Sequence, residues 1–145
     1  MFASGDVGIC RWAFFRGAST DAMVEQLVTH IHGSRPREGT VLIDIAYDIT
    51  FPSALQRTRI AEAVKDALGT HRRLISGHAV VTNSAVTRAT MTAINWLVRP
   101  QFPEQIFSDP ASALAWLNQL SPTVDVDATQ AAIRAAVPGF DRLAW

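Results

Sequence analysis

The clearest pattern of apolar and polar positions lies between residues 40 and 68. Its first part, residues 41–47, reads VLIDIAY and is apolar or small at every position except Asp44. A run of this kind predicts a strand that is covered on both faces, which is typical of a parallel strand in a layered α/β sheet. We therefore expect residues 41–47 to form the central strand of the domain.

A helix is predicted directly after this strand. Pro52 suits a first helical turn, and Thr50 or Phe51 lies where an N-cap is expected. Apolar residues then recur at helical spacing and form one stripe that should face the sheet. They are Ile60, Val64, Ala67 and Leu68. Ligand and partner sites in open α/β sheets lie at the carboxyl ends of strands, which here is the loop around residues 48–53.

The rest of the chain alternates between strand-like and helix-like patterns. The predicted strands cover residues 7–15, 41–47, 74–82 and 105–107, the last three parallel, and residues 1–3 should pair with 7–15 through a turn at 4–6. The predicted helices begin near residues 20, 52, 85, 110 and 128 and end near 33, 69, 98, 120 and 137. This alternation predicts an α/β domain with a mostly parallel sheet of about four or five strands and about four or five helices.

Composition narrows the class of protein. The chain has 145 residues, of which 48% are hydrophobic and 18% charged, as expected for one globular domain. We assign residues 1–120 to this domain and residues 121–145 to a C-terminal helix and an apolar tail. Acidic and basic residues balance at 13 each, so no overall charge favours nucleic acid or an anionic membrane. A single cysteine, no apolar run of membrane-spanning length and no signal-peptide pattern predict a cytoplasmic location.

Three segments of the chain carry recognisable motifs: VLIDIAY with its following helix, INWLVRP, and FPEQIFSDPASALAWL. The last is the most specific, because a short strand with a Phe precedes a helix of the type A-x-x-W-L, here Ala113 to Leu117. Together these segments resemble the SpoIIAA-like branch of the STAS family, a group of small bacterial domains that are also likened to CRAL-TRIO lipid-transfer domains. The resemblance covers about residues 7–120 and implies a STAS-like (SpoIIAA-like) α/β fold.

The resemblance implies two kinds of function. STAS antagonists of anti-sigma factors are phosphorylated on a serine in the loop after the central strand, and Ser53 occupies the comparable position. Its surroundings, TFPSAL, lack the Asp and the Gly of that motif, so an ordinary helix-start serine is the competing interpretation. The likeness to CRAL-TRIO domains implies instead an apolar ligand between the sheet and the helices.

Polar residues near the predicted strand ends are candidates for a ligand or partner loop, with a solvated surface as the alternative interpretation. They are Asp48, Thr50, Asn83, Ser84 and Thr87. Within the central strand, Asp44 is either a site acid or, as we favour, a residue at a bend that accepts hydrogen bonds from nearby backbone. His78 is interpreted as a core histidine with satisfied hydrogen bonds, and His30 and His32 as surface residues on different helix faces rather than joint metal ligands.

Aromatic residues supply the candidates for an interface. Trp96 lies off the apolar stripe of its helix, so it either covers the edge of the core or contacts a partner. The apolar tail, with Phe140, Leu143 and Trp145, packs either on its own domain or on a second copy of the chain.

The sequence contains no nucleophile–base pair, metal-ligand set or phosphate-binding glycine loop, so we expect no catalytic residues, no metal and no cofactor. We predict a non-enzymatic STAS-like regulatory or scaffolding domain that binds a protein partner, including itself as a homodimer. The alternative is a carrier or sensor of a small apolar, lipid-like ligand held between sheet and helices.

Overall fold

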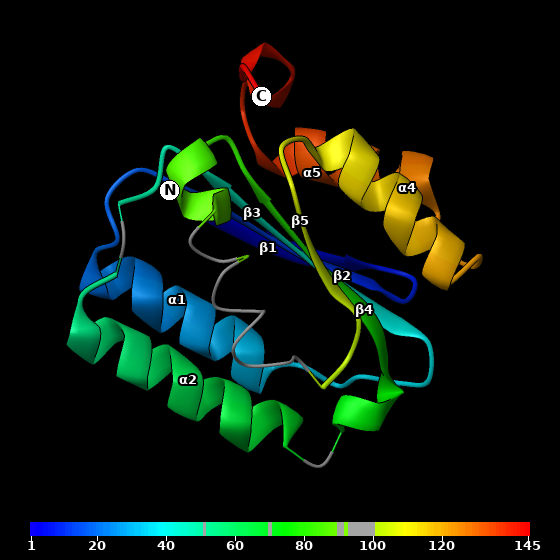
Figure 1. Cartoon of the computed structure of the whole chain (residues 1–145), viewed down its shortest axis with the longest axis horizontal. Coiled ribbons are helices and arrows are strands. Elements are labelled where there is room, and N and C mark those ends of the chain that lie inside the picture. The colour runs from blue at the N-terminus through cyan, green and yellow to red at the C-terminus, as the bar shows by residue number, and fades with distance from the viewer. Residues whose placement is uncertain (51, 70, 90–91, 93–100) are drawn as a thin grey trace.

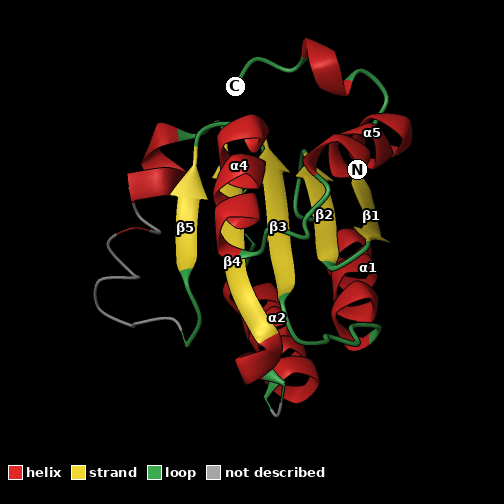
Figure 2. Ribbon diagram, turned by 90° about the vertical axis from the view of Figure 1, so that its right-hand side faces the viewer, coloured by secondary structure: helices red, strands yellow, loops and turns green. Residues whose placement is uncertain are grey.

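A computed structural model describes residues 1–50, 52–69, 71–89, 92 and 101–145 of the chain. Its centre is a five-stranded sheet in the order β1-β2-β3-β4-β5. The strands are β1 (Phe2–Val7), β2 (Cys10–Arg16), β3 (Thr40–Tyr47), β4 (Ile75–Thr82) and β5 (Glu104–Phe107). β1 is antiparallel to β2, and every other neighbouring pair is parallel. The predicted fold class, an α/β domain with a mostly parallel sheet, is confirmed (Figures 1 and 2).

Helices cover both faces of this sheet. α1 (Asp21–His32) and α2 (Ala54–Leu68) lie on one face, and α4 (Pro110–Leu120) and α5 (Val126–Ala136) lie on the other (Figure 1). Two short 3₁₀ helices cover Arg72–Leu74 and Phe140–Arg142. A helical segment also follows β4 at residues 85–89, and the remainder of the helix predicted for residues 85–98, with Trp96, lies outside the described residues. None of the described helices is long and apolar enough to cross a membrane.

The hairpin at the start of the chain differs from the prediction. Residues 4–6, predicted as its turn, lie inside β1, where Gly5 pairs with Trp12. Gly5 provides room for the indole, because a Cβ there would lie 2.9 Å from Cζ2 of Trp12. The chain reverses instead at Gly8, whose φ of 60° suits glycine. The polar Ser-Gly-Asp sequence is tolerated in β1 because this strand forms the edge of the sheet.

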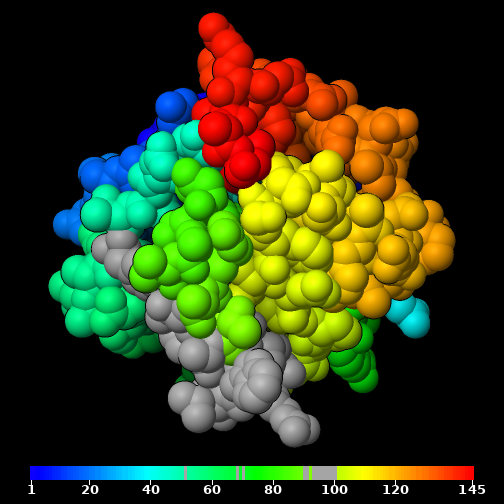
Figure 3. Space-filling view, turned by 45° about the horizontal axis from the view of Figure 1, so that its top comes forward, coloured from blue at the N-terminus to red at the C-terminus, as the bar shows by residue number. Residues whose placement is uncertain are grey.

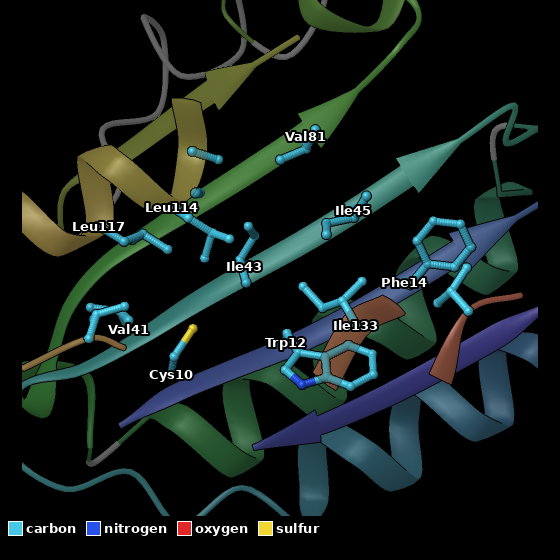
Figure 4. Close-up of a cluster of buried hydrophobic side chains, with 14 of the residues drawn as sticks. Cys10, Trp12, Phe14, Val41, Ile43, Ile45, Val81, Leu114, Leu117 and Ile133 are labelled. Atoms are coloured by element: carbon cyan, nitrogen blue, oxygen red, sulfur yellow. The ribbon is translucent and has the colours of Figure 1, made fainter. Parts of the chain in front are cut away.

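The main core lies between the sheet and the α4/α5 layer. Side chains from β2, β3 and β4 meet α4 and α5 there and are almost completely buried (Figure 4). The members labelled in the figure are Cys10, Trp12, Phe14, Val41, Ile43, Ile45, Val81, Leu114, Leu117 and Ile133. Gly77 lets α4 approach β4 closely, because a Cβ at this position would lie 2.5 Å from Cδ1 of Leu120. The close approach leaves little space between β4 and α4 at this position.

The C-terminal tail packs on its own domain. Phe140 is buried against Phe14, with ring centroids 6.1 Å apart, and the Trp145 ring lies 5.0 Å from that of Tyr47. The Ala144 amide donates a hydrogen bond of 3.3 Å to the Tyr47 hydroxyl. Leu143 is partly buried against the same core. In Figure 3 the tail, in red, lies against the neighbouring segments in green and yellow. All three predicted anchors of a subunit interface, Phe140, Leu143 and Trp145, therefore pack within the chain.

Candidate functional site

The two faces of the central strand β3 are covered to different degrees. Val41, Ile43 and Ile45 point to the α4/α5 layer and are fully buried. The alternate residues Leu42 and Ala46 point to the α1/α2 layer and are only half-buried, and the side chain of Asp44 between them is 41% exposed. α2 makes its close backbone contacts mainly with α1, whereas α4 and α5 lie close to the sheet. The prediction that this strand is covered on both faces is therefore correct for one face only.

Two adjacent cavities occupy the space between the sheet and the α1/α2 layer. Their volumes are about 220 and about 230 Å³. The first has an almost entirely apolar lining that includes Phe15, Met23, Val24, Ala46, Ile49 and Val80. The second adds polar side chains from three strands and α1: Arg11, His30, His78 and Glu104. Asp44, Leu27 and Ile60 line both cavities, so the two form neighbouring parts of one site, which we call the α1/α2 cavity.

A histidine held between two carboxylates forms the polar part of this site. Nε2 of His78 on β4 lies 3.0 Å from Oδ2 of Asp44 on β3, and its Nδ1 lies 2.9 Å from Oε2 of Glu104 on β5. The strand register explains the arrangement, because His78 is directly opposite both Leu42 and Glu104, and Asp44 is two residues beyond Leu42 on the same face. The interpretation of His78 as a satisfied core histidine is confirmed.

The hydrogen bonds determine the protonation state of His78. Burial alone would lower the pKa of His78, but the hydrogen bonds and charges of Asp44 and Glu104 outweigh this effect and raise the pKa to about 10. At neutral pH both ring nitrogens therefore donate, one to each carboxylate. An imidazolium with both N–H groups engaged has no lone pair for a proton or a metal ion. The cluster consequently contributes charge and hydrogen bonds rather than acid–base chemistry.

Asp44 has a different partner from the one predicted. The sequence favoured hydrogen bonds from nearby backbone, whereas the structure gives it the imidazole of His78, 34 residues further along the chain. That pairing depends on the register of β3 against β4, which the pattern within one strand does not contain.

The predicted surface histidines lie in different environments. His32 is exposed, but His30 is half-buried, lines the α1/α2 cavity and contacts Arg11, whose Nη2 lies 3.2 Å from its Nδ1. Burial and the charge of Arg11 lower the pKa of His30, so this imidazole is neutral at pH 7. Arg11 also forms an ion pair with Asp6 at 3.1 Å. No group of three or more His, Cys, Asp or Glu side chains in the described ranges is arranged to hold a metal ion.

Four of the five predicted loop residues at the strand ends form hydrogen bonds in two pairs. The amide of Asp48 donates to Oδ1 of Asn83 at 3.1 Å, and Nδ2 of Asn83 donates to Oδ1 of Asp48 at 2.7 Å. Ser84 accepts from the amide of Thr87 at 3.1 Å and caps the helical segment there. The carbonyl of Thr50 accepts from the Ser19 hydroxyl, which ties the loop to the start of α1. The structure thus brings Asp48 to Asn83 and Ser84 to Thr87, and only Thr87 of these five lines the α1/α2 cavity.

Ser53 is exposed and is the N-cap of α2. Its Oγ accepts a hydrogen bond of 3.2 Å from the amide of Gln56, and its own amide donates to Oε1 of Gln56 at 2.9 Å. The prediction of Thr50 or Phe51 as the cap was wrong, since Pro52 precedes the cap instead of starting the helix. A capping box satisfies two backbone groups at once, which explains a serine here without phosphorylation and contributes about 1 kcal/mol to stability.

No model of a known protein family matches the sequence, and neither does any curated protein. A similar solved structure is described as an uncharacterized protein from the DUF3478 family, with a SpoIIAA-like fold, from Shewanella loihica. The two chains are 15% identical, the match covers 80% of this chain and 93% of that one, and the TM-score is 0.49. Its description names the fold that the sequence motifs resemble and gives no activity.

Proposed function

We propose that this chain is a non-enzymatic binding domain that holds a small apolar molecule in the α1/α2 cavity. The supporting observation is the contrast between the two faces of β3, one closely packed and the other half-open beside two cavities. Concave, mostly apolar sites with a few convergent polar groups are typical of small-molecule binding. A volume near 230 Å³ suits a compact molecule or one short alkyl chain rather than a whole phospholipid.

The chemistry around the cavity supports binding rather than catalysis. His78 has both nitrogens engaged with carboxylates, so it cannot serve as a general base. The thiol of Cys10 lies on the opposite face of the sheet, in the α4/α5 core. Burial raises the pKa of this thiol to about 11, so it stays protonated and unreactive at neutral pH. Among the described residues that line the cavity, no side chain is activated as a nucleophile.

A protein partner is the second candidate function, and two exposed apolar side chains favour it. Leu55 is 75% exposed at the start of α2, and Val86 is 77% exposed in the helical segment after β4. Both follow the carboxyl ends of central strands, where partners bind in open α/β sheets. Ser53 lies two residues before Leu55, so a phosphate there would add charge beside this surface.

If the partner is a second copy of the chain, native mass spectrometry should show a dimer for the parent and a monomer for Leu55→Ser. The same number of subunits in the parent and the variant would contradict this interface.

A fluorescent apolar probe tests the proposed cavity function. N-phenyl-1-naphthylamine is neutral at pH 7 and becomes fluorescent in apolar surroundings. We expect saturable binding of one probe per chain. The substitution Ala46→Phe should weaken it about tenfold or more, because the larger ring occupies the space beside Leu27 and Ile60.

A matched variant distinguishes filling of the cavity from a general effect of added apolar surface. Ala61 is exposed on α2, so Ala61→Phe makes the same side-chain change away from the cavity and should leave probe affinity unchanged. Absence of saturable binding to the parent chain, or equal affinity of the parent and Ala46→Phe, would contradict the proposal.

A further inference from the structure

Another cavity, of about 340 Å³, lies at the amino end of β2 and β3, beside the α1/α2 cavity. It is bounded by the turn between β1 and β2 and by residues 33–37, which connect α1 to β3. Three arginine side chains line it: Arg11, Arg35 and Arg37. We call it the arginine cavity.

Hydrogen bonds to backbone carbonyls position two of these guanidinium groups. Nη1 of Arg35 donates to the carbonyls of His32 and Ser34 at 2.9 and 2.8 Å. Nη2 of Arg37 donates to the carbonyl of Gly8 at 2.9 Å. A guanidinium has five N–H donors, so each of the two groups keeps donors for an occupant of the cavity. These contacts therefore hold both cations in place without neutralising them.

The charged side chains that line the arginine cavity, three guanidinium groups and the carboxylate of Asp6, leave two positive charges in excess. Arg11 forms an ion pair with Asp6 at 3.1 Å, whereas no described carboxylate pairs with Arg35 or Arg37. Glu38 is exposed and does not line the cavity. The carbonyls at the end of α1 would repel an anion, but Arg11 and Arg35 donate to two of them.

A buried hydroxyl in the same cavity lacks a partner within the described part of the chain. Ser34 is only 7% exposed, and none of the described residues forms a hydrogen bond with its Oγ. Buried polar groups in proteins are almost always hydrogen-bonded. Ser34 lines both the arginine cavity and the neighbouring α1/α2 cavity. On the arginine side, a ligand with anionic oxygens can accept from this hydroxyl and from the guanidinium groups together.

We propose that the arginine cavity binds a small phosphate monoester, whose phosphate oxygens accept hydrogen bonds from Arg35, Arg37 and the hydroxyl of Ser34. A phosphate monoester carries close to two negative charges at neutral pH and has three strong acceptor oxygens, which match the two unpaired cations and the hydroxyl. A carboxylate supplies only one charge. Guanidinium groups also suit phosphate because their N–H donors bind two of its oxygens at once. This site is additional to the α1/α2 cavity and independent of its proposed function.

Three probes with the same ring and different head groups test this site: phenyl phosphate, benzoate and phenol. Each is titrated at pH 7 into the ¹⁵N-labelled chain, and binding is followed by the amide signals of Gly8, Ser34 and Thr40, which line the cavity. We expect saturable shifts with phenyl phosphate, binding of benzoate about tenfold weaker, and no binding of phenol, because charge-assisted hydrogen bonds are the stronger kind.

Three variants assign the contacts. Arg37→Gln should weaken phenyl phosphate about fivefold or more, because it removes one of the two unpaired charges. Arg57→Gln is the matched control and should leave the affinity unchanged, since Arg57 is exposed on α2 and likewise donates to a backbone carbonyl, that of Pro52 at 2.8 Å. Ser34→Ala should weaken phenyl phosphate about threefold without lowering the melting temperature, because the hydroxyl has no partner among the described residues.

The failure of this inference is distinguishable from failure of the proposed function. Absence of saturable shifts with phenyl phosphate, or equal affinities of phenyl phosphate and benzoate, would overturn the phosphate site. Equal losses of affinity in Arg37→Gln and Arg57→Gln would show a general charge effect and would also overturn it. None of these results concerns the binding of N-phenyl-1-naphthylamine, which tests the α1/α2 cavity separately.

Discussion

Replacing Ile45 by Asp should unfold the domain. Ile45 is fully buried in the middle of β3 and faces the core formed with α4 and α5. A carboxylate placed there has no partner, and its burial costs several kcal/mol, comparable with the total stability of a domain of this size. Urea denaturation followed by circular dichroism should show no folded baseline for this variant.

The next residue along the same strand provides the control. Ala46 points to the half-open α1/α2 cavity, so an aspartate there keeps part of its water, and Ala46→Asp should remain folded with a smaller loss of stability. Equal denaturation midpoints for the two variants would mean that the two faces of β3 are equally packed, contrary to the structure.

The substitution His78→Leu should reduce the free energy of unfolding by about 3 kcal/mol at pH 6, because it leaves Asp44 and Glu104 close together without the cation between them. The exposure of Asp44 to solvent keeps the loss at the lower end of the range for buried pairs. His32→Leu, which changes an exposed histidine on α1, is the matched control and should have little effect. Equal losses in the two variants would contradict the role of the cluster.

The pH dependence of this difference follows from the pKa of His78. The pKa is about 6.5 for a free histidine and about 10 in the folded protein, so folding favours the protonated form. The stabilisation is therefore fully present below pH 6.5, decreases as the pH rises towards 10, and is absent above it. The difference in stability between the parent and His78→Leu should be larger at pH 6 than at pH 10. A difference that does not change with pH would show that His78 is not held as an imidazolium.

The sequence predicted the features that depend on neighbouring residues. The apolar run of β3 and the starts of α1 and α4 near residues 20 and 110 are all found in the structure. Local patterns suffice here because a cap or a buried strand is determined by a few adjacent side chains. The hairpin turn was misplaced for the opposite reason: Gly5 is required by its contact with Trp12, on the neighbouring strand.

The candidate site depends on relations between strands, which is why the sequence indicated its parts without their arrangement. Asp44 and His78 were noticed as polar residues in apolar strands, but their pairing follows from the register of β3 and β4. Glu104 was not singled out, since a glutamate beside a short strand is an ordinary surface residue by pattern alone. The only available signal was that each buried polar residue in these strands required a partner.

Methyl NMR spectroscopy tests the central claim, that a small apolar molecule occupies the α1/α2 cavity. The chain would be labelled at Ile, Leu and Val methyl groups and titrated with N-phenyl-1-naphthylamine. The structure predicts shifts for Leu27, Ile60 and Val64, which line the cavity, and unchanged signals for the opposite core, represented by Ile43, Leu114 and Ile133. Unchanged spectra, or shifts confined to the opposite core or to Leu55, would contradict the claim.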